Sequence, residues 1–173
     1  MEKKKLYAAI VGYGNRGQVY GDYSLQCPDE FGVAAVIDPK EFKLREAKER
    51  YGLSDERVFH DFASFLKSGI ECDFVINATM DQFHYETTME ILGAGYDLLV
   101  EKPIVPNEKE LLDIKNLAEK KGVRVFVCHV LRYSPFYTKI KEILNSGIIG
   151  KIMTMEMNEH VCRQHYLASY DRG

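Results

Sequence analysis

The chain has 173 residues, of which 46% are hydrophobic and 28% charged, a composition typical of a folded globular domain with a sizeable core. A net charge of −3 gives no electrostatic basis for nucleic-acid binding, and no segment approaches the ~20 apolar residues that span a membrane, so neither is expected as a partner. The four cysteines form no Cys-x-x-Cys pair, which favours reduced thiols in a cytoplasmic protein over a metal site or a disulfide framework.

Short apolar segments alternate with charged segments of helical character along most of the chain. Apolar runs typical of buried strands span residues 5–11, 32–37, 57–60, 73–77, 96–100 and 123–127. Helices are expected between most of them, at residues 16–26, 41–51, 62–68, 82–94 and 108–121. Asp61 and Asn107 are placed to cap helix starts, and Gly52 is placed to end a helix. The alternation predicts the α/β class, with a Rossmann doubly wound parallel sheet over residues 1–128.

The first strand runs directly into a glycine motif, Gly12-Tyr13-Gly14-Asn15-Arg16-Gly17. Strand, glycine turn and helix in this order are the context in which G-x-G-x-x-G binds a dinucleotide. The first glycine permits a tight turn, the second lets backbone approach a pyrophosphate, and the third allows close helix packing. The helix N-terminus offers N–H groups to the phosphates, and Asn15 and Arg16 could add a hydrogen bond and a cation. Alone, the motif also fits a glycine-rich turn between unrelated elements.

An acidic residue at the end of the second strand supports the dinucleotide interpretation. Asp38 follows an apolar run, at the distance from the glycines where a carboxylate accepts hydrogen bonds from an adenosine ribose. The alternative is a solvated residue that caps the next helix. A carboxylate here favours NAD(H) over NADP(H), because a 2′-phosphate would bring like charge against it. Lys40 could partly neutralise that phosphate, so NADP stays the alternative cofactor.

Ligands of such sheets bind beyond the carboxyl ends of the strands. Besides the glycine turn and Asp38, this edge is predicted to carry Thr79 after the fourth strand, Glu101 and Lys102 after the fifth, and His129 after the sixth. We therefore expect these residues beside the bound nucleotide.

After residue 128 the pattern changes. Ser134-Pro135 begins a helix expected to run to Ser146. Residues 151–157 then alternate, with three methionines on one face, as in a half-buried strand of an antiparallel sheet. Residues 129–173 are therefore interpreted as the incomplete beginning of a second α/β domain for substrate binding and oligomerisation. Its exposed strand edge and methionine face favour a homo-oligomer.

In combination, these residues resemble the Gfo/Idh/MocA family, which is named after glucose–fructose oxidoreductase, inositol dehydrogenase and a rhizopine catabolism protein. The resemblance runs over essentially the whole chain. It rests on residues 12–17, Asp38, Ala78-Thr79 with His84, Glu101-Lys102-Pro103, residues 129–135 and residues 146–152. The Glu-Lys-Pro triplet at a strand end is its most specific part. The resemblance implies an NAD(P)-dependent oxidoreductase acting on a sugar or polyol.

The resemblance also implies roles for single residues. Lys102 matches a lysine that contacts substrate hydroxyls beside the nicotinamide, where an ammonium can hold a developing alkoxide or exchange its proton; the alternative is a surface lysine in a turn. Glu101 resembles a residue that positions the lysine or the ribose. His84 matches a histidine near the nucleotide loop, or is a helix-surface residue with local hydrogen bonds. His129 and Arg132 are implied to face the substrate cleft, and Arg132 fits an interdomain salt bridge equally well.

The sequence departs from the family pattern in two ways. Met80 stands where members often carry proline. The family's catalytic histidine and a nearby aspartate come from beyond Gly173, and neither His160 nor His165 replaces them. The chain is therefore expected to bind NAD(H) with negligible turnover. Two classes of function stay open: an NAD-dependent dehydrogenase of a sugar or polyol, and a nucleotide-binding regulator of sugar metabolism with the same fold.

Overall fold

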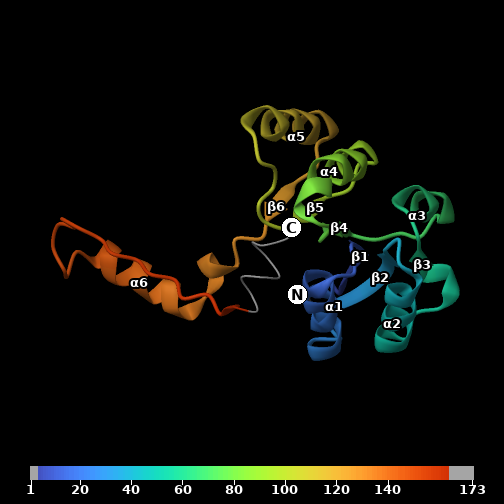
Figure 1. Cartoon of the computed structure of the whole chain (residues 1–173), viewed down its shortest axis with the longest axis horizontal. Helices are drawn as coiled ribbons and strands as arrows, with labels where there is room; N and C mark the ends of the chain where they lie inside the picture. The colour runs from blue at the N-terminus through green and yellow to red at the C-terminus, as the bar shows by residue number, and fades with distance from the viewer. Residues whose placement is uncertain (1–3, 164–173) are drawn as a thin grey trace. The chain divides into compact units, whose positions relative to one another are not determined.

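The computed structural model describes residues 4–163 and divides the chain into two compact units between His129 and Val130. The first unit holds a six-stranded sheet in the order β3-β2-β1-β4-β5-β6 (Figure 1). All neighbouring strands in it are parallel. This strand order is that of the doubly wound Rossmann fold, so the predicted fold class is confirmed.

The strands and α-helices of the first unit lie within two residues of their expected bounds. The strands are β1 (Leu6–Val11), β2 (Phe31–Ile37), β3 (Val58–Phe59), β4 (Phe74–Asn77), β5 (Leu98–Val100) and β6 (Val125–Val127). The helices are α1 (Asn15–Gln26), α2 (Glu41–Tyr51), α3 (Phe62–Ser68), α4 (His84–Gly93) and α5 (Glu108–Lys121), with short 3-10 helices η1 (Asp55–Arg57) and η2 (Asp81–Phe83).

Local sequence explains where several helices begin and end. The Asp61 side chain accepts the N–H of Ser64 at 2.7 Å at the start of α3. Asn107 accepts the N–H of Glu110 at 2.9 Å at the start of α5. Both are side-chain N-caps of the expected kind. Gly52 ends α2 in the left-handed conformation, with φ of 64°.

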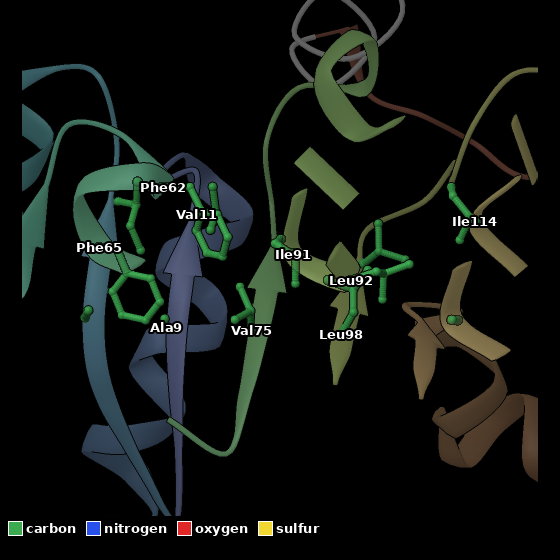
Figure 2. Packing of buried hydrophobic residues seen from close by; sticks show 13 residues of the cluster. Ala9, Val11, Phe62, Phe65, Val75, Ile91, Leu92, Leu98 and Ile114 are labelled. Atoms are coloured by element: carbon green, nitrogen blue, oxygen red, sulfur yellow. The ribbon is translucent and has the colours of Figure 1, made fainter. Parts of the chain in front are cut away.

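The sheet separates two apolar layers. On one face α3, α4 and α5 pack against the strands through Ala9, Val11, Ala35, Ile37, Phe62, Phe65, Val75, Ile91, Leu92, Leu98, Val100, Ile114 and Ala118. Figure 2 shows how this layer extends from Phe62 and Phe65 of α3, past Val75 in the middle of the sheet, to Ile114 of α5. On the other face α1 and α2 pack over the β1–β3 half of the sheet through a second layer that includes Ile10, Val36 and Leu44.

The β4–β6 half of this second face carries exposed apolar surface. A cavity of about 520 Å³ lies beside α1, and its apolar lining includes Phe31, Phe74, Ile76 and Leu99. The neighbours of Phe126 in β6 pack into the opposite layer, so strand alternation places its ring on this face. Phe126 is 52% exposed. No helix of the first unit covers this half of the sheet, because the right-handed crossovers through α4 and α5 lie on the other side.

The second unit contains η3 (Val130–Tyr133) and α6 (Pro135–Ser146). The expected strand at residues 151–157 is wrong: no strand forms in the described part of this unit, and Met153, Met155 and Met157 are all exposed. A strand needs a neighbour to satisfy its N–H and C=O groups, and the unit's described residues supply none. His165 lies outside the described residues. The interpretation of residues 129–173 as the beginning of a second domain stays a prediction.

Candidate nucleotide-binding site

The glycine turn links β1 to α1 at the carboxyl edge of the sheet. Gly12 has φ of 89°, and a Cβ there would lie 2.6 Å from the carbonyl oxygen of Ala78. A Cβ on Gly17 would lie 2.2 Å from the carbonyl oxygen of Gly12, because the first turn of α1 packs on the strand end. A Cβ on Gly14, by contrast, would meet no atom within 4 Å. The turn is therefore tightly packed at its outer glycines and open at Gly14, as close approach of a pyrophosphate requires.

The N-terminus of α1 presents backbone N–H groups that can donate hydrogen bonds to a ligand. In the described structure no side chain caps this end, and its first turn contains no acidic residue. The helical ladder begins with the N–H of Gln18, which donates to the carbonyl of Gly14 at 3.0 Å. The N–H groups of Asn15, Arg16 and Gly17 have no acceptor among residues 4–163. These donors and the positive end of the helix dipole together fit a phosphate group.

Asp38 lies next to the glycine turn. Its Oδ2 accepts the N–H of Tyr13 at 2.9 Å, and its Oδ1 accepts the N–H of Lys40 at 2.9 Å. Each carboxylate oxygen keeps a lone pair with which to accept a ribose hydroxyl. The ring of Tyr13 is fully buried and packs edge-on against Tyr51, so only the backbone of Tyr13 is available to the site. The structure thus brings the glycine turn and the predicted ribose ligand together.

A buried amide that sequence reasoning missed organises the loop after β4. The Oδ1 of Asn77 accepts the hydroxyl of Thr79 at 2.7 Å and its N–H at 3.2 Å. The Nδ2 of Asn77 donates to the carbonyl of His84 at 3.3 Å and to the hydroxyl of Thr88 at 3.1 Å. Its position as the one polar residue that ends an apolar strand could have indicated such a role. Asn77 therefore fixes Thr79 at the binding edge.

His84 is buried, so the helix-surface interpretation of this residue is wrong. Its Nδ1 lies 2.6 Å from the carbonyl oxygen of Pro103, and its Nε2 lies 3.0 Å from that of Thr79. Both oxygens are acceptors, so a neutral ring donates to one of them and a doubly protonated ring to both. The ring joins the loop after β4 to the loop after β5. Any contribution of His84 to nucleotide binding therefore acts through these two loops.

Four side chains meet between α1 and the ends of β5 and β6. The Nε of Arg16 donates to Oε1 of Glu101 at 2.6 Å, and its Nη2 donates to the hydroxyl of Tyr20 at 3.0 Å. The Tyr20 hydroxyl donates to the same Glu101 oxygen and contacts Sγ of Cys128. Arg16, expected to reach the phosphates, is thus paired with a carboxylate. The sequence gives no sign of the roles of Tyr20 and Cys128, because neither belongs to a recognisable motif.

The cluster consists of one carboxylate surrounded by donors. Burial opposes ionisation of Glu101, but the hydrogen bonds from Tyr20 and Arg16 outweigh it and hold the pKa of this carboxyl below its usual value. Burial raises the pKa of the Tyr20 hydroxyl and that of the Cys128 thiol. Both groups therefore stay protonated at neutral pH, while Glu101 carries the negative charge.

Lys102 follows Glu101, two residues beyond the end of β5. Its backbone N–H donates to Oε2 of Glu101 at 3.1 Å, and its peptide bond to Pro103 is cis. The side chain is exposed, and its ammonium forms no hydrogen bond or ion pair with another described residue. An uncommitted ammonium at this edge can bind a hydroxyl or a developing alkoxide.

The two residues expected at the substrate cleft belong to different units. His129 is exposed after β6, where its N–H donates to the carbonyl of Val127 at 2.8 Å. Arg132 is exposed within η3 of the second unit. The proximity of either residue to Lys102 stays a prediction.

Three further features concern the whole described chain. Among residues 4–163 no group of three His, Cys, Asp or Glu side chains is placed to hold a metal ion. The cysteines are free thiols: Cys27, Cys72, Cys128 and Cys162. No helix in the same range has both the length and the apolar character needed to cross a bilayer.

Comparison with known proteins identifies the family. The profile of the Gfo/Idh/MocA family, an oxidoreductase family with an NAD-binding Rossmann fold, matches residues 6–129. The chain belongs to this family. The matched range includes every strand of the sheet, the glycine turn, Asp38 and Lys102. The predicted family and its NAD-binding fold are therefore confirmed.

Relatives with assigned activities include inositol dehydrogenases. The scyllo-inositol 2-dehydrogenase (NADP(+)) IolW of Bacillus subtilis is 28% identical over 149 residues, which are 86% of this chain and 40% of that protein. The inositol 2-dehydrogenase/D-chiro-inositol 3-dehydrogenase of Lactiplantibacillus plantarum is 27% identical over 152 residues, 87% of this chain and 43% of that protein. The chain thus spans less than half the length of either relative.

Solved structures share the fold. The scyllo-inositol dehydrogenase of Lactobacillus casei, crystallised with NAD(H) and scyllo-inositol, superposes with a TM-score of 0.78 at 22% identity, over 86% of this chain and 43% of that one. An NAD-binding protein from Listeria innocua gives a TM-score of 0.74 at 28% identity, over 86% of this chain and 42% of that one. The likeness to the first of these shows the fold alone.

Proposed function

We propose that this chain is the nucleotide-binding part of an NAD-dependent oxidoreductase that acts on a sugar or polyol hydroxyl. The observation that carries the proposal is the glycine turn, open at Gly14 and bonded through Tyr13 to Asp38, at the same sheet edge as an uncommitted Lys102. Family membership supports the reaction class, and the inositol dehydrogenases among the relatives support a polyol as substrate. When bound, NAD supplies the carbon that accepts the hydride.

In this proposal, different residues of the chain bind the two halves of the dinucleotide. The turn backbone and the N–H groups of Asn15, Arg16 and Gly17 hold the pyrophosphate, while Asp38 accepts hydrogen bonds from the adenosine ribose. Lys102 holds the substrate hydroxyl at the nicotinamide end and exchanges its proton. Thr79 and Glu101 shape the adjacent loops, and His129 and Arg132 contact substrate.

We further propose that the 173-residue chain by itself catalyses negligible reduction of NAD by a sugar or polyol. Hydride transfer needs a substrate held in line as well as an acid–base group. Lys102 is a candidate acid–base group at this sheet edge, with an ammonium that has no partner among the described residues, but it does not by itself hold a substrate in line. Turnover in a longer protein that contains this chain separates the dehydrogenase from the alternative, a nucleotide-binding regulator of sugar metabolism.

Calorimetry with NADH and a spectroscopic assay of NAD reduction over a panel of sugars and polyols test these proposals together. We expect NADH binding and negligible reduction of NAD. In a longer protein that contains this chain, Lys102→Ala should lower the reduction rate at least about a hundredfold. Lys109→Ala, an exposed lysine in α5, is the matched control and should leave the rate unchanged. Failure to bind NADH at millimolar concentration would overturn the proposal.

We also propose that copies of the chain associate. The exposed apolar half of the second sheet face, with Phe126 and the cavity beside α1, is surface that association would remove from water. The exposed methionines of residues 153–157 add to it.

A further inference from the structure

The turn Glu101-Lys102-Pro103 is held from two directions. On the α1 side, the Glu101 carboxylate is bound by Arg16 and Tyr20. On the α4 side, Nδ1 of His84 lies 2.6 Å from the carbonyl oxygen of Pro103. Lys102 therefore sits between two residues whose polar groups are both fixed, and its own backbone N–H is bonded to Glu101.

The Tyr20 hydroxyl is at the centre of the α1 side. It accepts a hydrogen bond from Arg16, donates one to Glu101 and contacts the thiol of Cys128. A phenol has one proton and two lone pairs, so donation to Glu101 leaves it to accept from Arg16 and from the protonated thiol. The hydroxyl thus links α1 to the ends of both β5 and β6.

Tyr20 suits a positioning role better than Arg16 does. The Arg16 side chain is 41% exposed, so its ion pair is screened by solvent. The Tyr20 ring instead packs against the apolar layer under α1, and the guanidinium of Arg16 lies over it at 5.1 Å. The ring therefore carries its hydroxyl to a fixed place relative to β5.

We propose that Tyr20 is a positioning residue for Lys102, because its hydroxyl fixes Glu101 and Glu101 in turn fixes the Lys102 backbone. The inference rests on the proposed function, in which Lys102 serves the nicotinamide end of the site. In this proposal the Arg16 side chain also binds Glu101. It thereby holds the end of β5 and does not bind the phosphates. The adenosine end, built by the glycine turn and Asp38, does not depend on this network.

The experiment compares NADH with ADP-ribose, which has the adenosine and pyrophosphate but lacks the nicotinamide. Calorimetry is run on the wild type, on Tyr20→Phe and on Tyr23→Phe. Tyr20→Phe keeps the ring and removes the hydroxyl. Tyr23→Phe is the matched control, because Tyr23 is on the same helix and its hydroxyl bonds Glu30 instead of Glu101.

We expect Tyr20→Phe to weaken NADH binding about tenfold and to leave ADP-ribose binding within about twofold, since one hydrogen bond to a charged group is lost at one end of the site. Tyr23→Phe should change neither. Equal effects of Tyr20→Phe on both ligands, or no effect on either, would overturn the proposal. A wild-type chain that binds neither ligand contradicts the proposed function instead.

Hydrogen exchange at the Lys102 amide decides the positioning role without any ligand. Its bond to Glu101 should protect it, and both Tyr20→Phe and Glu101→Gln should speed its exchange while the amides of β1 and β2 keep their rates. Faster exchange throughout the sheet would show a purely structural role and contradict the proposal. An unchanged Lys102 amide in both variants would contradict it as well.

Discussion

The Nε of Arg16 lies 2.6 Å from Oε1 of Glu101, across 85 positions of sequence. The contact joins the first turn of α1, which follows the glycine motif, to the strand end that carries Lys102. The first turn of α1 and the end of β5 are therefore joined by side chains as well as by the sheet. Removing either partner leaves the other without its counter-charge, which for the nearly buried Glu101 is the larger loss.

The ionisation of Glu101 should make the free energy of unfolding depend on pH in the acid range. Its pKa is lowered in the folded chain, so its contribution is complete above the unfolded value of about 4.3 and is lost as the pH falls through the folded value. Urea unfolding of the wild type and of Glu101→Gln should therefore differ most at neutral pH and converge as the pH falls through the lowered pKa of folded Glu101. Glu119→Gln, which alters an exposed pair with Lys115, is the control and should show little difference at any pH. A Glu101→Gln difference that does not vary with pH would contradict this assignment.

Asp38 should select the cofactor. Its carboxylate can accept ribose hydroxyls but repels a 2′-phosphate, so the wild type should bind NADH at least about tenfold more tightly than NADPH. Asp38→Asn keeps an oxygen that can accept the N–H of Tyr13 and removes the charge. This variant should therefore show a smaller preference for NADH over NADPH. Calorimetry with both cofactors measures the ratio. A wild type that binds NADPH more tightly than NADH would contradict the prediction.

His84 should stabilise the fold through the two loops it joins. His84→Ala leaves carbonyls of Thr79 and Pro103 without their buried partner, which should cost about 1–3 kcal/mol in free energy of unfolding. His60→Ala is the control, because His60 is exposed and pairs with Glu41 at the surface, where the loss should be below about 1 kcal/mol. Denaturant titrations give both values. Equal losses in the two variants would refute the structural role of His84.

Self-association should depend on the exposed half of the second sheet face. Sedimentation of the wild type is expected to show a dimer or larger species. Phe126→Ser should shift the distribution toward monomer, because it removes a half-exposed aromatic ring from the edge strand of that face. Phe42→Ser changes a similarly exposed ring on α2 and should not. A wild type that stays monomeric at high concentration contradicts the proposal.

Much of this fold could be predicted because its determinants are local. The glycine turn, the caps at Asp61 and Asn107 and the glycine that ends α2 each act on residues within a few positions of themselves. Asp38 could be placed because a parallel sheet brings the ends of β1 and β2 together. Sequence patterns carry such short-range chemistry directly.

The rest of the site depends on pairing between distant residues. The Tyr20 hydroxyl reaches Glu101 over 81 positions and Cys128 over 108, and no sequence pattern connects them. For the same reason the sequence suggests the nearby phosphates as a partner for the Arg16 side chain and gives no sign of its distant carboxylate, Glu101. The prediction of a strand at residues 151–157 is wrong for a different reason. Alternation is a necessary feature of a half-buried strand, but the strand also needs a neighbour to pair with.

Binding of NADH to Gly14→Val tests directly whether the glycine turn holds a dinucleotide. Gly14 has φ of −81°, which suits any residue, and a Cβ there meets no atom within 4 Å, so the variant should fold. Its side chain would occupy the space proposed for the pyrophosphate. Gly93→Ala in α4 also adds a Cβ into open space and is the matched control. By calorimetry, we expect Gly14→Val to bind NADH at least about a hundredfold more weakly than the wild type, and Gly93→Ala to bind it as the wild type does. A folded Gly14→Val that binds NADH with wild-type affinity would contradict it.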